Sequence, residues 1–395
     1  MDPISNPYSP GAGTKPPALA GRDELREKIR IGLERIRAGR AAKSILMVGL
    51  RGVGKTVLLD QIMADAEAAG IHTLRMEAPE HKSLPALLAP SLRGALLKLS
   101  RTEKAMDLGQ RALRALAGFA KSLKVKYNDI EVAIDYEPET GLADNGDLES
   151  DLTDLFEAAG RSAREASTAL VLFIDELQYV AEDELAILIT VLHRCAQRQL
   201  PISLVGAGLP QLRGKMGEAK SYAERLFDFP EIGPLPRAAA DEALALPAEE
   251  LNVSYTKDAL ERIFADTHGY PYFLQEWGKH AWDVAVESPI TAEIVEVASR
   301  EAIAALDAGF FGVRFDRLSQ TEKAYMRAMA ELGSGPHRSG DVAERIGKNI
   351  TKLGTVRSSL IMKGMIFSPT HGETAFTVPL FDEYMRRIMP LTIEK

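Results

Sequence analysis

The feature that most constrains this chain is a glycine-rich junction between two apolar segments, in the stretch SILMVGLRGVGKTVLLDQIM. The run SILMVG has the length and composition of a buried strand, and TVLLDQIMADAEAA continues with helical spacing. Between them, the residues from Gly49 to Thr56 fit the spacing G-x-x-x-x-G-K-[ST] in full. Glycines let successive backbone N–H groups curl around a polyphosphate, and the N-terminus of the following helix favours negative charge. The junction therefore predicts a site for the phosphates of a nucleotide.

A nucleotide site of this kind also needs a cation, a magnesium ligand and a group that acts on water. Lys55 would bind the β- and γ-phosphates, and the Thr56 hydroxyl would ligate Mg²⁺. The apolar run ALVLFI ends in Asp175 and Glu176, and Asp175 lies 120 positions after Lys55. Asp175 would hold Mg²⁺ through water, and Glu176 would polarise the attacking water. The acidic pair favours ATP hydrolysis over kinase-type transfer, with ATP and Mg²⁺ as the predicted cofactors.

The order of apolar patterns predicts the fold class. Strand-like and helix-like segments alternate through residues 19–236, which indicates an α/β core with a parallel sheet and helices on both faces. Within this core, residues 121–137 alternate apolar and polar side chains and are expected to form an inserted hairpin, whose role is left open.

Three further regions flank the core. Residues 1–18 are rich in proline and glycine, and we expect an extended arm there rather than a packed element. Residues 237–310 show helical patterns alone, which predicts a small all-α lid. Residues 311–395 show three helices followed by two short strands, which is the order of a winged helix.

Composition and charge exclude several classes of protein. A formal net charge of −8 argues against a protein that coats nucleic acid. The charge is uneven, because residues 315–395 carry 12 Lys and Arg against 9 Asp and Glu, net +3, which leaves −11 for the rest. No apolar run could span a membrane, the first residues lack a signal-peptide core, and the single Cys195 fits a reducing compartment. We therefore expect a cytoplasmic protein without a membrane partner.

The basic residues of the C-terminal region surround the third helix of the expected winged helix. Lys352 and Arg357 lie on this helix, Lys348 precedes it and Lys363 follows it. A third helix of this kind enters the major groove, so double-stranded DNA is the expected partner, with binding that weakens steeply with salt. Winged helices also dock proteins. A regulatory or signalling ATPase whose winged helix binds protein rather than DNA therefore stays open.

These motifs together resemble the AAA+ ATPases, and within them the initiator-like group related to archaeal origin-recognition and cell-division-control ATPases. PPALAGRDELRE looks like the entry box of that group, which packs against adenine, and THGYPYFLQEWGKHAW looks like its helical lid. The resemblance implies that the nucleotide is bound by Leu19, Gly21, Arg22, Gly49, Arg51, Gly52, Val53, Gly54, Lys55, Thr56 and Val57.

The same resemblance points to an arginine that acts between subunits. SYAERLFDFPEIGPL looks like the family's arginine-finger segment, which makes Arg225 the candidate. In a homo-oligomer its guanidinium would stabilise charge on the γ-phosphate held by a neighbouring subunit during hydrolysis. The structural alternative is an arginine that pairs with Asp228 or Glu231.

Two positions depart from the family pattern. Gly206 and Ala207 end an apolar run where the family often places a polar residue that senses the γ-phosphate. Tyr272 stands where initiators usually carry an arginine in the lid. These departures favour a slowly hydrolysing nucleotide switch over a vigorous motor.

Overall fold

The computed structural model describes residues 1–395 apart from 12, 79–82, 124–135, 348, 371 and 391–395. The chain divides into two compact units. The core unit consists of Arg22–Gly49 and Lys55–Ile232, and the second unit of Met1–Gly21, Leu50–Gly54 and Gly233–Lys395. The middle of the glycine-rich junction therefore groups with the C-terminal half of the chain.

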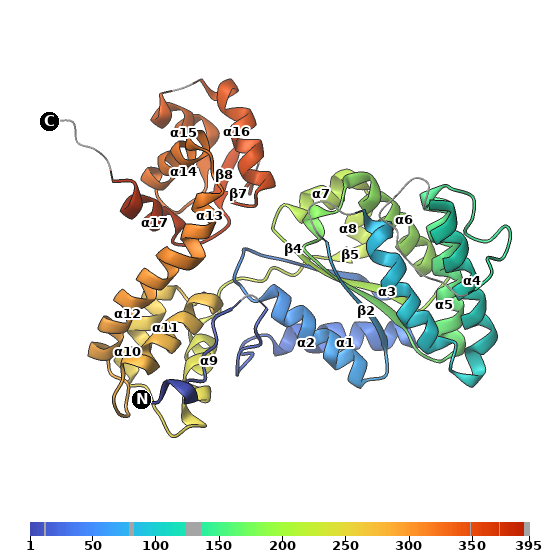
Figure 1. The fold of residues 1–395 in the computed structure, drawn as a ribbon, viewed down its shortest axis with the longest axis horizontal. Helices are drawn as coiled ribbons and strands as arrows, with labels where there is room; N and C mark the ends of the chain where they lie inside the picture. The colour runs from blue at the N-terminus through green and yellow to red at the C-terminus, as the bar shows by residue number, and fades with distance from the viewer. Residues whose placement is uncertain (12, 79–82, 124–135, 348, 371, 391–395) are drawn as a thin grey trace. The chain divides into compact units, whose positions relative to one another are not determined.

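A five-stranded parallel sheet forms the centre of the core unit (Figure 1). The strand order is β2-β3-β4-β1-β5. The carboxyl ends of parallel strands meet at one edge of a sheet, so the residues that follow β1 and β3 lie on the same edge, on either side of β4. The strands are β1 (Ser44–Val48), β2 (His72–Glu77), β3 (Leu170–Asp175), β4 (Ile202–Gly208) and β5 (Phe227–Asp228).

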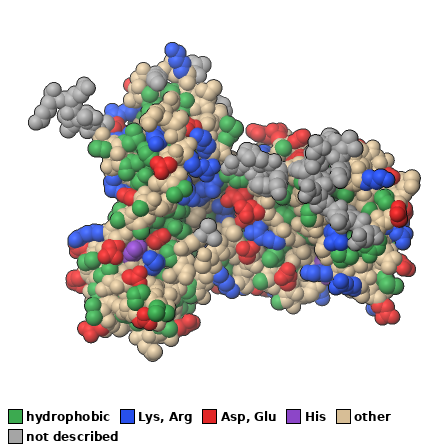
Figure 2. Space-filling view, in the orientation of Figure 1, with side chains coloured by type: hydrophobic (Ala, Val, Ile, Leu, Met, Phe, Trp, Pro, Cys, Tyr) green, Lys and Arg blue, Asp and Glu red, His purple; other side chains and the backbone are tan. Residues whose placement is uncertain are grey.

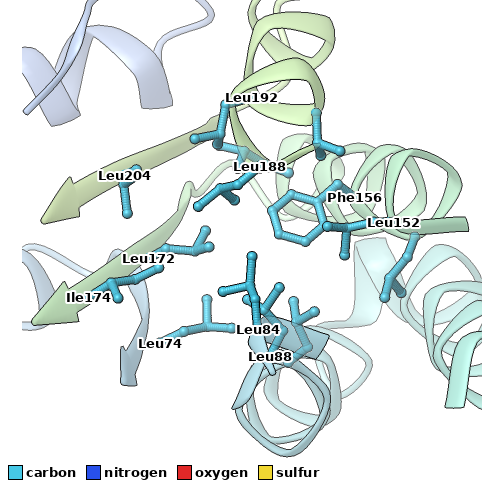
Figure 3. Packing of buried hydrophobic residues seen from close by; sticks show 14 of the residues in the cluster. Leu74, Leu84, Leu88, Leu152, Phe156, Leu172, Ile174, Leu188, Leu192 and Leu204 are labelled. Atoms are coloured by element: carbon cyan, nitrogen blue, oxygen red, sulfur yellow. The ribbon is translucent and has the colours of Figure 1, made fainter. Parts of the chain in front are cut away.

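Helices cover both faces of this sheet, as the sequence predicts. In Figure 1, α1 and α2 lie on one face, and α3, α5 and α6 lie on the other. Figure 3 shows the packing on the second face, where Leu172 and Ile174 of β3 face Phe156 and Leu188. Burying each such side chain contributes about 2 kcal/mol. The helices of the core unit are α1 (Asp23–Arg37), α2 (Lys55–Ala68), α3 (Leu84–Leu99), α4 (Met106–Leu123), α5 (Leu148–Glu165), α6 (Glu182–Gln197), α7 (Leu212–Ala219) and α8 (Ala223–Leu226).

The hairpin predicted at residues 121–137 is wrong at its start. Residues 121–123 end α4. The Ser122 hydroxyl donates to the Phe119 carbonyl over 3.2 Å and to Asp151 of α5 over 3.1 Å, and both bonds tie this segment to helices. Residues 124–135 lie outside the described part of the chain.

In the second unit, the region predicted to be helical begins with four α-helices: α9 (Arg237–Glu249), α10 (Lys257–Thr267), α11 (Pro271–Val284) and α12 (Ala292–Leu306). A π-helical turn (Asp307–Phe311) follows α12, and α13 (Gly312–Asp316) follows that turn without a loop. The domain boundary expected at residue 310 falls inside this helical path. Phe311 is buried, with its ring centroid 6.2 Å from that of Phe273 and 5.2 Å from that of Tyr384.

The C-terminal region of the second unit contains the expected three helices and two strands. Two elements were not expected from the sequence: β6, which joins the strands in an antiparallel sheet of order β6-β8-β7, and α17. The bounds, in chain order, are α14 (Gln320–Leu332), β6 (His337–Arg338), α15 (Ser339–Ile346), α16 (Ile350–Met362), β7 (Ile366–Phe367), β8 (Glu373–Phe376) and α17 (Phe381–Ile388).

The prediction that residues 1–18 form an arm without packing is wrong. Tyr8 is only 3% exposed, and its ring lies against Gly278 of α11, where an added Cβ would be 2.8 Å away. The Tyr8 hydroxyl donates to the Leu244 carbonyl and accepts from Tyr255 over 3.0 Å. Burial of the Tyr8 ring anchors the arm, because it stabilises packing more than the prolines and glycines of the arm favour an extended, solvated chain.

Candidate nucleotide-binding site

Lys55 and Gly49 flank the glycine-rich loop in the core unit. Lys55 begins α2 and is 8% exposed, and its Nζ donates to the Gly49 carbonyl over 2.9 Å. Thr56, the next residue of the helix, is partly exposed. A lysine held at a helix N-terminus in this way places a cation where the helix also favours an anion.

The loop between them adopts the backbone that its glycines permit. Gly52 and Gly54 have φ values of 81° and 86°, in the left-handed region that favours glycine. Within the second unit, an added Cβ on Gly52 would lie 3.1 Å from the ring of Tyr270. The Tyr272 N–H donates to the Gly52 carbonyl over 3.2 Å. A larger residue at Gly52 would therefore strain both the backbone and this contact.

Asp175 ends β3 at the carboxyl edge of the sheet, the edge at which β1 leads into Gly49. Asp175 is 3% exposed, and its Oδ1 accepts from the Glu176 N–H over 2.9 Å. The guanidinium of Arg75 lies 3.5 Å from Oδ2 and also bonds Asp60 of α2 over 2.6 Å. These contacts hold the Asp175 carboxylate beside the positive charge of Arg75.

Glu176 has an unusual backbone and a positioned side chain. Its φ is 53°, in the left-handed region that non-glycine residues adopt at some cost. Its carboxylate accepts a hydrogen bond from the Gln178 side-chain amide. Gln178, 8% exposed, in turn accepts from the Leu209 N–H over 3.1 Å just past the end of β4. Gln178 therefore fixes the Glu176 carboxylate to β4, a role that our reading of the sequence missed.

The donor set at this edge fits magnesium. Mg²⁺ prefers oxygen ligands and in nucleotide sites takes one or two from the protein, with phosphates and waters completing an octahedron. The Thr56 hydroxyl and the Asp175 carboxylate are the oxygens of this kind predicted from the sequence. Among the described residues no group of three or more His, Cys, Asp or Glu side chains could hold a metal by itself, so a bound magnesium would depend on the nucleotide.

The remaining predicted nucleotide contacts lie in both units. Gly21 has a φ of 68° and packs against α9, where an added Cβ would be 2.8 Å from that of Ala239. Arg22 precedes α1, and burial lowers the pKa of its guanidinium. Leu19, Arg51 and Val57 are partly exposed, whereas Val53 is buried.

Arg225 lies at the surface of the core unit. It belongs to the short helix α8, its side chain is exposed, and it forms no ion pair with any residue that the structure describes. Of its two expected structural partners, Asp228 and Glu231, Asp228 pairs instead with Lys28 over 3.1 Å and with Lys43 over 3.5 Å.

Two protein-family models match the chain, and one of them includes this site. The model of the AAA ATPase domain matches residues 18–205, a range that includes Gly49–Thr56, Asp175 and Glu176. Residues 18–205 are an AAA ATPase domain. Residues 308–385 match a second model, described as a domain of unknown function (DUF8462). No sequence among the curated proteins matches the chain significantly.

Solved structures share the fold of this chain. The Walker-type ATPase PABY2304 of Pyrococcus abyssi aligns with a TM-score of 0.59 and 15% identity over 94% of this chain and 97% of that chain. Weaker likenesses are to the Aeropyrum pernix ORC1 protein in complex with DNA (TM-score 0.47, 16% identity, 94% of each chain) and to the Thermotoga maritima RuvB Holliday junction branch migration motor (TM-score 0.44, 16% identity, 92% and 96%). At such identities the first match supports the fold, and the others add no argument.

Packing explains the first departure of the AAA ATPase domain from the family pattern. Gly206 lies inside β4, where an added Cβ would be 2.7 Å from the Cδ2 of Leu46 and would also clash with Leu177. Ala207 is fully buried. A larger side chain at Gly206 would have to displace Leu46 and Leu177. Just past this end of β4, the side-chain amide of Gln178 accepts a hydrogen bond from the Leu209 N–H.

The predicted DNA-contacting residues differ in their surroundings: one is exposed, and two bond to other residues of the C-terminal region. Lys352 is exposed on α16. Arg357 instead bonds within the C-terminal region, to the Thr374 hydroxyl over 3.0 Å and to the Ser368 hydroxyl over 2.8 Å. Lys363 pairs with the buried Glu322 over 2.7 Å. Lys348 lies outside the described residues.

The contact with Lys363 helps to lower the pKa of Glu322. Burial acts to raise the pKa of Glu322, but hydrogen bonds from Lys363, from the Ser319 backbone and from the Ser359 hydroxyl outweigh it and lower the pKa to about 2. Lys363 therefore neutralises a buried carboxylate, which reduces the charge it can offer to a DNA phosphate.

In the described part of the chain, no helix is both long enough and apolar enough to pass through a bilayer.

Proposed function

We propose that this protein binds Mg-ATP in its AAA ATPase domain and hydrolyses it slowly, as a nucleotide-dependent switch. The observation that carries the proposal is the placement of Lys55 and Asp175 at one edge of the parallel sheet, with Glu176 fixed beside them by Gln178. Lys55 binds the phosphates, and Thr56 and Asp175 hold Mg²⁺, which supplies charge neutralisation at the phosphates.

Glu176 is the residue that acts on water. Its carboxylate orients the attacking water and accepts a hydrogen bond from it, and the amide of Gln178 limits the rotation of that carboxylate. In the family that the chain resembles, a polar residue near the position of Gly206 often senses the γ-phosphate, and an arginine usually stands at the position of Tyr272; this chain has neither. Slow turnover suits a switch, because the ATP-bound state then lasts long enough to control a partner.

We propose double-stranded DNA as that partner, bound through a winged helix formed by α14, α15, α16 and the sheet β6-β8-β7. The order of these elements and the exposure of Lys352 on α16 support this proposal. Arg357 contributes by holding the strands against α16 and does not contact phosphate. The DNA surface is therefore less basic than the sequence alone suggests.

Fluorescence anisotropy with a labelled duplex tests this proposal. We expect binding that depends on whether ADP or a non-hydrolysable ATP analogue is present, and that weakens steeply with salt. Lys352→Ala should reduce the affinity several-fold and the salt slope by about 1, as expected for one lost phosphate contact. Lys257→Ala is the matched control, because Lys257 is a 90% exposed lysine of α10.

A second function is favoured by the internal bonds of Arg357 and Lys363. If these cations are structural, the C-terminal region docks a protein, and the molecule is a regulatory ATPase without a DNA site. The anisotropy experiment separates the two functions. A salt-insensitive signal at the background level, unchanged by Lys352→Ala, would rule out DNA and leave the protein-docking function.

We also propose that Arg225 acts on the nucleotide of a neighbouring subunit in a homo-oligomer. Its exposure on α8 and the absence of an ion pair with a described residue support this role. Wild-type hydrolysis per subunit should rise with protein concentration, and Arg225→Ala should lower it by at least 100-fold without changing ATP affinity. Arg161→Ala, on an exposed position of α5, is the control. A specific rate independent of concentration would contradict the proposal.

A further inference from the structure

The helix that follows β4 carries a lysine that faces the turn after Glu176. This turn is a short 3₁₀ helix (Leu177–Tyr179), and Glu176 lies at its start. In α7, Leu212 and Met216 are buried, and Lys215 lies between them at helical spacing, so these three side chains share the inner face of the helix. The turn and α7 both belong to the core unit.

Lys215 bonds two backbone carbonyls of the turn. Its Nζ donates to the Gln178 carbonyl over 2.9 Å and also to the Val180 carbonyl. The last carbonyls of a helical turn have no partner within the turn, and a buried carbonyl that is left unpaired costs free energy. One ammonium group can serve both carbonyls because it has three N–H donors. Lys215 therefore stabilises the turn from outside it.

Gln178 is held at both ends by the segment that follows β4. Its backbone carbonyl accepts from Lys215, its side-chain carbonyl accepts from the Leu209 N–H over 3.1 Å, and its side-chain amide donates to the Glu176 carboxylate. Gly208 leaves room for this arrangement, because an added Cβ there would lie 2.8 Å from the Gln178 Oε1. The direction of the amide therefore depends on the bonds at both ends of the residue.

The surroundings of Lys215 suit a charged donor at a half-buried position. Burial lowers the pKa of its ammonium group, and the negative charge of Glu182 opposes that effect. Figure 2 shows Asp and Glu side chains on the surface near the place of α7 in Figure 1, and Glu182 and Asp183 line a surface cavity together with Ala219 of α7. Like Glu182, the two carbonyls that accept from Lys215 favour its charged form.

We propose that Lys215 is a positioning residue for ATP hydrolysis. By holding the turn Leu177–Tyr179, it orients the Gln178 amide, and this amide directs the Glu176 carboxylate toward the attacking water. In this role Lys215 acts through Gln178 and contacts no reacting atom. The inference rests on the proposed function, in which Glu176 acts on water.

Lys215→Met is the test variant, because methionine keeps most of the apolar body of the side chain and removes the donor. Single-turnover phosphate release should fall about fivefold, and the ATP affinity from calorimetry should stay within a factor of about 3 of the wild type. Lys215→Arg keeps a cationic donor and should restore about half of the wild-type rate. Lys98→Met, at an exposed position of α3, is the matched control and should hydrolyse ATP as the wild type does. Wild-type turnover in Lys215→Met would overturn the inference.

A double variant shows whether Lys215 acts through Gln178. Lys215→Met combined with Gln178→Ala should be no slower than Gln178→Ala alone, because the amide that Lys215 orients is then absent. If the two losses multiply instead, Lys215 acts independently of this amide, and the inference is wrong.

Hydrogen–deuterium exchange tests the inference without relying on hydrolysis. The Tyr179 and Val180 N–H groups form the backbone hydrogen bonds of the turn, over 3.0 and 3.2 Å. Without nucleotide, these two amides should exchange several-fold faster in Lys215→Met than in the wild type, and Lys98→Met should match the wild type. If the wild type hydrolyses no ATP, the proposed function fails. Equal exchange in Lys215→Met and the wild type would overturn the inference itself, whether or not ATP is hydrolysed.

Discussion

Replacing Lys55 by alanine should lower the affinity for ATP by roughly 100-fold, or about 3 kcal/mol. The Lys55 Nζ lies at the start of α2 with the Gly49 carbonyl as its hydrogen-bond acceptor, and no other lysine belongs to the glycine-rich motif. Its loss removes a charge-assisted contact to the phosphates at a partly dehydrated position, where such contacts are strongest. Titration calorimetry with ATP in the presence of magnesium measures the effect.

The control for this experiment is Lys104→Ala, at an exposed position between α3 and α4. It should bind ATP as the wild type does. The Lys55→Ala protein should keep a cooperative thermal transition without nucleotide, which shows that the variant is folded. If its ATP affinity equals that of the wild type, the assignment of the nucleotide site to the glycine-rich loop is wrong.

Replacing Glu176 by glutamine should abolish most hydrolysis while ATP stays bound. Glutamine has nearly the same shape but cannot take up negative charge, so it orients water poorly and accepts no proton. We expect a fall in single-turnover phosphate release of at least 100-fold, within the range that general-base catalysis supplies. Calorimetry should give an ATP affinity within a factor of about 3 of the wild type, since Glu176 is not a phosphate contact.

Gln178→Ala is a matched variant that tests how Glu176 is positioned. It keeps the Glu176 carboxylate and removes the amide that donates to it and accepts from the Leu209 N–H. Hydrolysis should fall by roughly tenfold, which is less than in Glu176→Gln, because a misdirected base still acts some of the time. Wild-type turnover in Glu176→Gln would remove Glu176 from the mechanism.

Much of the core unit was predictable from the sequence because each of its signals is local. The run before Gly49 and the run ending in Asp175 are short and apolar, which is typical of strands buried on both faces. Motif spacing then placed Lys55 and Asp175 at strand ends, and the parallel sheet brings strand ends to one edge. β5 and β6 have two residues each and were missed, because a pair of residues carries no periodicity and neither pair lies in an apolar run beside a predicted turn.

The features that the sequence did not reveal depend on contacts between distant residues. Tyr8 looks like part of a solvated arm until α11 supplies Gly278 beneath its ring. Arg357 has the right type and place for a DNA contact, and only the fold of β8 shows that Thr374 receives its hydrogen bond. Gln178 is a polar residue two positions after Glu176 in an otherwise apolar turn. This position in the sequence could have indicated that it bonds the Glu176 carboxylate.

The helical path from α12 through the π-helical turn into α13 has a mechanical consequence. Its 25 residues, Ala292–Asp316 by number, form a rod roughly 37 Å long with no hinge of loop residues along it. The aromatic ring of Phe311, wedged among Phe273 and Tyr384, stiffens the one place where the winding changes. Such a rod behaves as a lever, so a slight tilt at α12 becomes a stroke of several ångströms at the far end.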